Sequence, residues 1–146
     1  MKIVVCASID FTPQIKQAKE QLEKMGHSVD IPKYSQKIIA GEVTLEEFMA
    51  EKNARGDGKF REDAEEDLIL RYYNLIKESD AILVLNVEKK GIAGYIGANV
   101  FLEIGFAYAL EKKIFLYNNI PEMMHKDEVV AMKPIVINQD FSKINK

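Results

Sequence analysis

Glu103 has the strongest indication of a chemical role, because its neighbours in the sequence are almost all apolar or glycine. Between Ile96 and Leu110, the other polar groups are Asn99 and the hydroxyl of Tyr108. Such a segment predicts a buried helix, and an ionised carboxylate taken out of water costs several kcal/mol unless it is paired or neutralised. We therefore predict that Glu103 belongs to a site of chemistry. The alternative is a structural carboxylate that holds a neighbouring loop through backbone N–H groups.

The residues just before Glu103 favour a ligand site at the start of the same helix. Asn99 lies four residues earlier, so the two side chains share one helix face. Glycines at positions 91, 94 and 97 let the backbone approach a ligand closely, and the free N–H groups of a helix N-terminus bind anions. We therefore predict that Gly97 and Asn99 contact a ligand beside Glu103.

An alternation of expected strands and helices positions these residues. Short apolar segments predict strands at 2–7, 27–31, 81–85, 113–117 and 134–137. Helical spacing predicts helices at 12–25, 61–78, 97–110 and 123–131, the first with Thr12 as N-cap and Pro13 as first residue. The alternation predicts an α/β fold, a flavodoxin- or Rossmann-like doubly wound sheet of five parallel strands with helices on both faces. The expected strand order is 2-1-3-4-5, with right-handed crossovers.

The segment from 33 to 61 interrupts this alternation and is predicted to be a lid or insertion in a single domain of residues 1–146. It contains one expected short helix, at about 45–52, and a turn at 55–58. Two interpretations of its basic side chains stay open, a solvated mixed-charge surface and phosphate recognition by some of them. These side chains are Lys33, Lys37, Lys52, Arg55, Lys59 and Arg61.

Polar residues collect where the expected strands end. Ser8 and Asp10 follow the first strand, Asn86 the third and Asn118 the fourth. In open α/β sheets a ligand binds beyond the carboxyl ends of the strands where the strand order reverses, which is here between strands one and three. We therefore predict that these residues contact the ligand. For the two asparagines, local turn formation is the alternative.

The composition argues against several other classes of protein. A chain of 146 residues fits one domain, and its net charge of -3 argues against nucleic-acid binding. Cys6 is the single cysteine, which excludes a disulfide within the chain, and His27 and His125 match no metal-ligand spacing. No apolar stretch has membrane length and the N-terminus lacks a secretory pattern. We therefore expect a cytoplasmic protein with no metal and no membrane partner.

Three segments carry a resemblance to a known family. The segment Phe101-Leu-Glu103-Ile-Gly-Phe-Ala107, preceded by the strand Asp80-Ala-Ile-Leu-Val-Leu-Asn86, resembles the nucleoside 2-deoxyribosyltransferase family, which includes the 2'-deoxynucleoside 5'-monophosphate N-glycosidases. The opening Cys6-Ala-Ser-Ile9 is similar to the strand-one loop that holds substrate in the nucleotide hydrolases. Apart from 33–61, the order of elements matches that family over nearly the whole chain.

The resemblance implies that Glu103 is the nucleophile in the cleavage of an N-glycosidic bond. Its carboxylate would attack C1' of a nucleoside or nucleoside 5'-monophosphate, expel the base and form a covalent glycosyl-enzyme. Water would complete a hydrolase reaction, and a second base a transferase reaction. The resemblance also implies substrate contacts at Ser8 and Ile9, no cofactor, and a homodimer or higher homo-oligomer in which a neighbouring subunit completes the pocket.

The proton donor and the class of function stay open at this point. Where the family usually has an aspartate, in the helix before strand three, this chain has Tyr72 and Tyr73. The donor is therefore open between Asp10 and a tyrosine. Two other functions also stay open, a non-catalytic nucleotide-binding module and a flavodoxin-like flavin protein.

Overall fold

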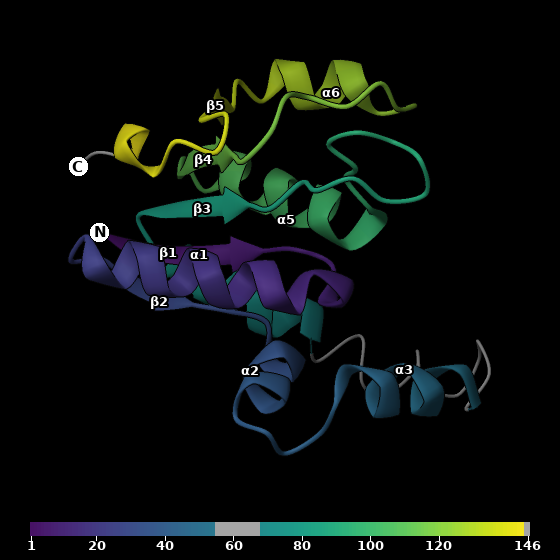
Figure 1. The fold of residues 1–146 in the computed structure, drawn as a ribbon. Coiled ribbons are helices and arrows are strands. Elements are labelled where there is room, and N and C mark those ends of the chain that lie inside the picture. The colour runs from purple at the N-terminus through teal and green to yellow at the C-terminus, as the bar shows by residue number, and fades with distance from the viewer. Residues whose placement is uncertain (55–67, 145–146) are drawn as a thin grey trace.

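The computed structural model describes residues 1–54 and 68–144 and contains a five-stranded parallel sheet (Figure 1). The strands are β1 (Lys2–Cys6), β2 (Ser28–Asp30), β3 (Ala81–Val84), β4 (Lys113–Leu116) and β5 (Ile135–Val136), in the order β2-β1-β3-β4-β5. This confirms the predicted α/β class and strand order. Each strand is one or two residues shorter than predicted.

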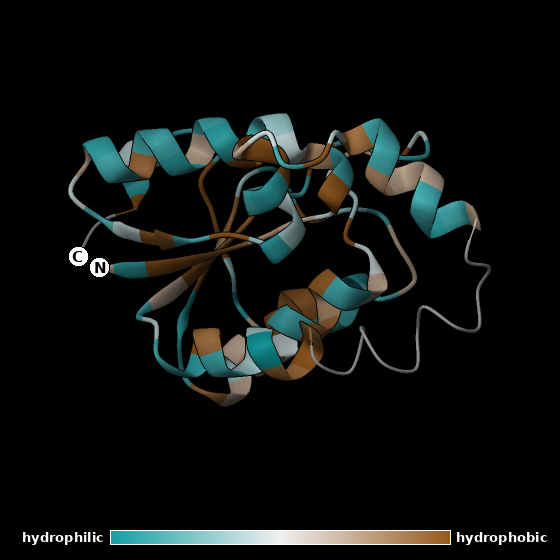
Figure 2. Ribbon diagram, turned by 90° about the horizontal axis from the view of Figure 1, so that it is seen from below, coloured by the Kyte–Doolittle hydropathy of each residue, from teal (hydrophilic) through white to brown (hydrophobic). Residues whose placement is uncertain are grey.

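Helices cover both faces of the sheet, which forms an apolar layer between them (Figure 2). Strand β1 alternates between the faces, since Ile3 and Val5 pack in one buried cluster while Val4 and Cys6 pack in the other. The first cluster is covered by α1 (Thr12–Lys24). The second is covered by the helical residues 68–77, by α5 (Ala98–Ala109) and by α6 (Lys126–Ala131).

The segment after β2 folds into two helices, α2 (Lys33–Ile39) and α3 (Leu45–Ala54). The predicted short helix at 45–52 is therefore confirmed and slightly longer. Tyr34 of α2 packs against Phe48 of α3, with their ring centroids 4.6 Å apart. The predicted turn at 55–58, the rest of the proposed lid to 61, and the predicted helical residues 61–67 lie outside the described residues.

Two predicted helix starts are wrong. A short 3-10 turn, η1 (Ile9–Phe11), leads directly into α1, so Thr12 is the first helical residue and Phe11 the N-cap. The Thr12 hydroxyl instead donates to the Ile9 carbonyl at 2.6 Å and bonds the Ser35 hydroxyl at 3.0 Å, which ties α1 to α2. Helix α6 begins at Lys126, because residues 123–125 form a turn.

Asn86 and Asn118 join the carboxyl ends of β3 and β4. The Asn118 backbone N–H donates to the Asn86 side-chain oxygen at 2.8 Å, and the Asn118 amide donates back to the Asn86 carbonyl at 3.0 Å. The Asn86 amide also donates to the carbonyls of Asn118 and Asn119, at 3.1 and 3.0 Å. This clamp packs against Gly94, which has a φ of +71°. It fixes the far end of the loop that follows β3.

Gly94→Ala should destabilise the fold by more than ~2 kcal/mol, because an added Cβ would stand 2.5 Å from the Asn119 carbonyl oxygen. Gly91→Ala is the matched control, since its φ of +73° is similar but no described atom lies within 4 Å of an added Cβ. The control should lose only the cost of the left-handed backbone, ~1 kcal/mol. Urea unfolding measures both losses, and equal losses would contradict the role of the clamp.

Candidate functional site

A pocket of about 660 Å³ opens at the edge where the strands end, next to β1 and β3. Pockets of ~300–1,000 Å³ typically hold small-molecule ligands. Its described walls come from the β1 loop, the β3 loop, α2, α3, residues 68–77 and α5. The predicted site residues that line it are Ser8, Ile9, Gly97, Asn99 and Glu103. The structure therefore brings these predicted residues together at the predicted place, beyond the carboxyl ends of β1 and β3.

The Glu103 carboxyl is held in apolar surroundings at this pocket. The residue as a whole is only half-buried, but its Oε2 atom is shielded from solvent and has no hydrogen-bond partner within the described residues. Burial raises the pKa of Glu103 to about 8, and the Cys6 thiol partly opposes this by hydrogen bonding to the carboxyl. Glu103 is therefore mostly protonated at neutral pH, which avoids an unpaired charge.

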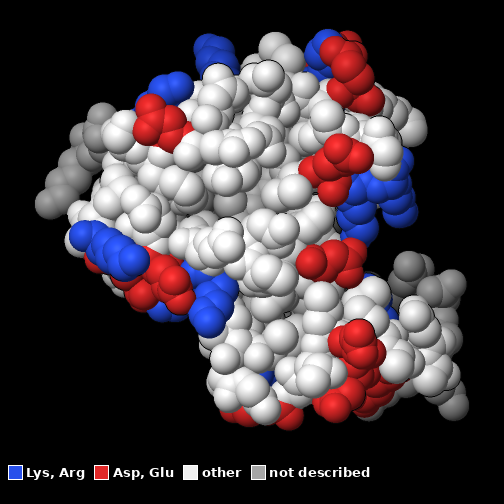
Figure 3. Space-filling view, in the orientation of Figure 1, with Lys and Arg blue, Asp and Glu red and all other residues white. Residues whose placement is uncertain are grey.

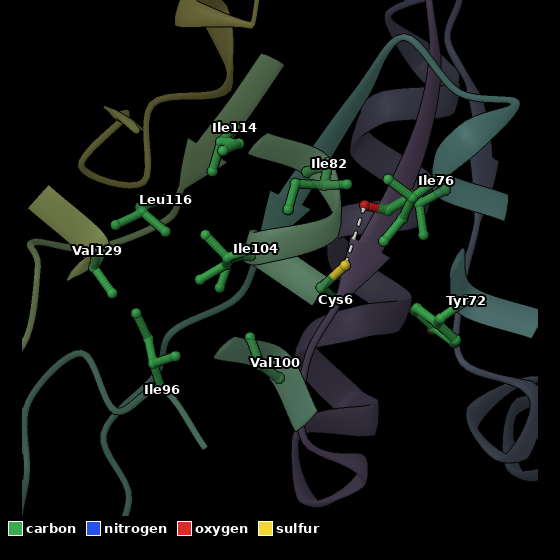
Figure 4. Close-up of a cluster of buried hydrophobic side chains, with 13 residues drawn as sticks. Cys6, Tyr72, Ile76, Ile82, Ile96, Val100, Ile104, Ile114, Leu116 and Val129 are labelled. Atoms are coloured by element: carbon green, nitrogen blue, oxygen red, sulfur yellow. Dashed lines mark hydrogen bonds between the residues drawn. The ribbon is translucent and has the colours of Figure 1, made fainter. Parts of the chain in front are cut away.

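Cys6 and Tyr72 belong to one buried cluster, and both interact electrostatically with Glu103. Figure 4 shows Cys6 between Tyr72 and the α5 side chains Val100 and Ile104. The Tyr72 hydroxyl donates to the Val5 carbonyl at 3.3 Å. Burial first, and then the nearby Glu103 carboxylate, raise the pKa of both Cys6 and Tyr72 well above their ordinary values. Both groups therefore stay protonated at neutral pH, and Tyr72 lies within electrostatic range of Glu103.

Helix α5 is not buried on all sides, which corrects the expectation from its sequence. One stripe packs on the sheet, through Val100, Ile104 and Ala107. Leu102 and Tyr108 are 40% and 53% exposed. A helix against a sheet buries only one stripe, so the remaining apolar residues face the pocket or solvent. Glu103 lies next to the buried stripe, which accounts for its half-buried state.

Lys89 is a pocket residue that the sequence analysis missed. Its Nζ lies 2.5 Å from Asp10 Oδ2 and donates to the Ser8 hydroxyl at 3.0 Å. The Ser8 hydroxyl also contacts Asp10 Oδ2, at 3.4 Å. Three side chains from the β1 and β3 loops therefore form one cluster. The available signal was a lysine four residues beyond the end of the predicted strand 81–85, but it looked like ordinary loop polarity.

Asp10, Asn86 and Asn118 are predicted site residues that are not among the described residues lining the pocket. Asp10 is held by Lys89, and the two asparagines form the clamp between β3 and β4. Their direct contact with a ligand stays a prediction. Their observed role is to hold the loops that carry Ser8 and Lys89.

Helices α2 and α3 add an aromatic and basic wall that was predicted only in part. Tyr34 and Phe48 line the pocket together with Lys33 and Lys52. Lys37 instead lies over the outer side of the Tyr34 ring, 6.0 Å from its centroid. The other basic residues considered for phosphate recognition, at 55, 59 and 61, lie outside the described residues.

Within residues 1–54 and 68–144, no group of three or more His, Cys, Asp or Glu side chains is placed to hold a metal ion. No helix in the same ranges has the length and apolar character needed to cross a membrane.

Comparisons of the chain with protein-family models, with curated proteins and with solved structures found no match. The fold class is inferred from the observed strand order, which proteins of many unrelated functions share. Functional assignment therefore rests on the pocket and its side chains.

Glu103→Gln should flatten the pH dependence of stability between about pH 5 and pH 8. The folded protein keeps the Glu103 proton up to about pH 8, whereas an unfolded chain releases it near the ordinary value of 4.5. Between these values the unfolded state binds fewer protons, so wild-type stability falls as pH rises, by up to ~1.4 kcal/mol per pH unit.

Denaturant unfolding at several pH values measures this slope. Glu88→Gln, at an exposed glutamate of the β3 loop, is the matched control and should keep the wild-type slope. An unchanged slope in Glu103→Gln would contradict the buried, protonated state of Glu103.

Proposed function

We propose that this protein cleaves or exchanges the N-glycosidic bond of a nucleoside or nucleoside 5'-monophosphate, with Glu103 as nucleophile. The observation that carries the proposal is the Glu103 carboxyl, which lies at the ligand-binding edge of the sheet with a buried oxygen that has no described partner. The segments around Glu103 and Ser8 resemble the nucleoside 2-deoxyribosyltransferase family. This resemblance supports N-glycosidic bond cleavage as the specific reaction of the carboxyl. The pocket volume of about 660 Å³ accommodates a ligand of this size.

The reaction proceeds in two displacements at C1' of the sugar. In the first, an oxygen of ionised Glu103 forms a bond to C1' while the bond to the base nitrogen breaks, and the base leaves with a proton. In the second, water or another base attacks C1' and releases Glu103. Water gives a hydrolase, and a base gives a deoxyribosyltransferase. No cofactor takes part in either step.

Tyr72 is the stronger of the two candidates for the proton donor. Its hydroxyl keeps its proton at neutral pH and lies within electrostatic range of Glu103. Asp10, the other candidate, is held in an ion pair with Lys89 and is not among the described lining residues.

The wild-type protein should release free base from at least one member of a panel of nucleosides and nucleoside 5'-monophosphates. Glu103→Gln should reduce that release at least ~1,000-fold, because it keeps the shape of the side chain and removes the nucleophile. Chromatography of the free base measures the rate, with Glu88→Gln as the control that keeps wild-type activity. Equal release by Glu103→Gln and wild type would overturn the proposal.

The pH profile should show the ionisation of Glu103. Because the attacking species is the carboxylate and the pKa of Glu103 is about 8, kcat/KM should rise about tenfold per pH unit on the acidic side. It should level off above about pH 8. Initial rates at low substrate concentration measure the profile. A kcat/KM that is already level from about pH 5 would contradict a raised pKa in the free enzyme.

A non-catalytic nucleotide-binding module is the second candidate function. One observation favours it, since Glu103 is the single carboxylate among the described lining residues and therefore has no second carboxylate beside it in that part of the lining. Such a module would be stabilised against heat by its ligand and would release no base from any panel member.

We also propose that the protein is cytoplasmic and that it forms a homodimer or higher homo-oligomer. Exposed apolar side chains border the pocket at Ile69 and Leu102, 36% and 40% exposed, and Leu70 nearby is 56% exposed. Apolar patches of this kind mark protein contacts. Light scattering at several concentrations measures the mass, and a monomer throughout would oppose this assembly.

A further inference from the structure

A second pocket, of about 510 Å³, lies at the amino ends of the strands. Its described lining includes Lys113 and Ile135, the first residues of β4 and β5, whereas the Glu103 pocket lies beyond the carboxyl ends of β1 and β3. The two pockets share no described lining residue. A ligand of the second pocket would therefore bind apart from the proposed chemistry at Glu103.

The topology of the sheet creates this second pocket. Strands β4 and β5 are parallel neighbours, so the turns that lead into them from α5 and α6 lie at the same edge. Both helices also pack in one buried cluster, through Ala107 and Val129. A residue with left-handed backbone follows each helix, Glu111 with a φ of +56° and Lys133 with a φ of +52°. Glycine is the usual residue there, so both positions keep a charged side chain on a backbone that disfavours it.

The lining of the second pocket has an excess of positive charge. Lys112, Lys113 and Lys133 line it together with one carboxylate, Glu111. Each of the two helix ends adds at most about half a negative charge, so about one positive charge is left over. Within residues 1–54 and 68–144, none of these three lysines forms an ion pair or a side-chain hydrogen bond.

This excess of positive charge is local. The net charge of the chain is -3. On the face drawn in Figure 3, acidic and basic side chains are interspersed around a broad uncharged area. The charge of the second pocket therefore does not reflect a generally basic surface.

Apolar side chains form the rest of the lining. Tyr108 and Ile135 line the pocket and are 53% and 47% exposed, and Ala109, Ile114 and Met132 line it beside them. Ligand pockets of ~300–1,000 Å³ typically combine such apolar walls with a few polar groups that fix the orientation of the ligand. Exposed ammonium groups alone hold a bare ion weakly in water, because solvent and salt screen the attraction. A ligand of this pocket therefore needs an apolar body as well as a charge.

We propose that the second pocket binds a small organic monoanion, with its apolar body against Tyr108 and Ile135 and its negative group among the three lysines. An excess of about one positive charge matches a single anionic group. Contact with lysine ammonium groups makes the hydrogen bonds to that group charge-assisted. The site is independent of the reaction proposed for Glu103, since it uses none of the same residues.

The test is the binding of three matched probes, followed by NMR shifts of backbone amides. 1-Naphthoate has an apolar body and one negative charge, 1-naphthamide has the body without the charge, and acetate has the charge without the body. Naphthoate should bind at least ~10-fold more tightly than either of the others. The shifts should centre on Ala109, Lys113 and Ile135. No naphthoate binding, equal affinity for naphthoate and another probe, or shifts centred on Ser8 and Gly97 would overturn the proposal.

Lys133→Gly should weaken naphthoate binding about fivefold, because it removes one of the three ammonium groups. It should leave naphthamide binding within about twofold. Glycine favours the left-handed backbone at this position, so the variant should unfold at the same or a higher urea concentration than the wild type. A loss of binding in this variant therefore does not come from a loss of fold.

Glu111→Gly is the matched control, because it makes the same backbone change in the same pocket and removes the opposite charge. It should strengthen naphthoate binding. Lys16→Met changes the net charge as Lys133→Gly does, but Lys16 is an exposed residue of α1, which covers the other face of the sheet. It should keep the wild-type affinity within about twofold. Weaker binding in both glycine variants, or an equal loss in Lys16→Met, would refute the site.

Discussion

The parallel pairing of β1 with β3 is the constraint on which the site depends. Cys6 pairs with Val84, so both strands end at the same level of the sheet and their loops leave side by side. Parallel neighbours need a crossover through a helix, and the crossover after β3 is α5 itself. This one pairing therefore brings Ser8, Lys89 and Glu103 to a common pocket from distant parts of the chain.

In the proposed function, binding and reactivity would fall to different groups in this pocket. The causes that set the pKa of Glu103 are burial and the Cys6 thiol, with no contribution from a lysine. The lysines therefore favour an anionic ligand without ionising the carboxyl. Ionisation of Glu103 at neutral pH instead requires a new donor near Oε2, such as a ligand hydroxyl or a reoriented Tyr72 hydroxyl. Such a donor would link ligand binding to the appearance of the nucleophile.

The sequence predicted the sheet and its ligand-binding edge because apolar segments such as 81–85 have few alternatives in a chain that alternates strands with helices. It singled out Glu103 as a candidate site residue because a lone carboxylate in an apolar segment is energetically unusual. It did not predict the partners of Asp10 or the clamp between Asn86 and Asn118, since these contacts join residues on separate loops. It also overestimated the burial of α5, because an apolar segment does not reveal which neighbouring elements cover it.

The surroundings of Glu103 bear on the alternative that its carboxylate is structural. A carboxylate that holds a loop accepts backbone N–H groups, and those bonds would lower its pKa. Glu103 instead has a raised pKa and a buried Oε2 without a partner in the described chain. Above the ordinary pKa of glutamate, this arrangement makes the fold less stable than an amide at the same position would. A residue that weakens the fold while facing a pocket is better explained by what it does to a ligand than by what it holds in place.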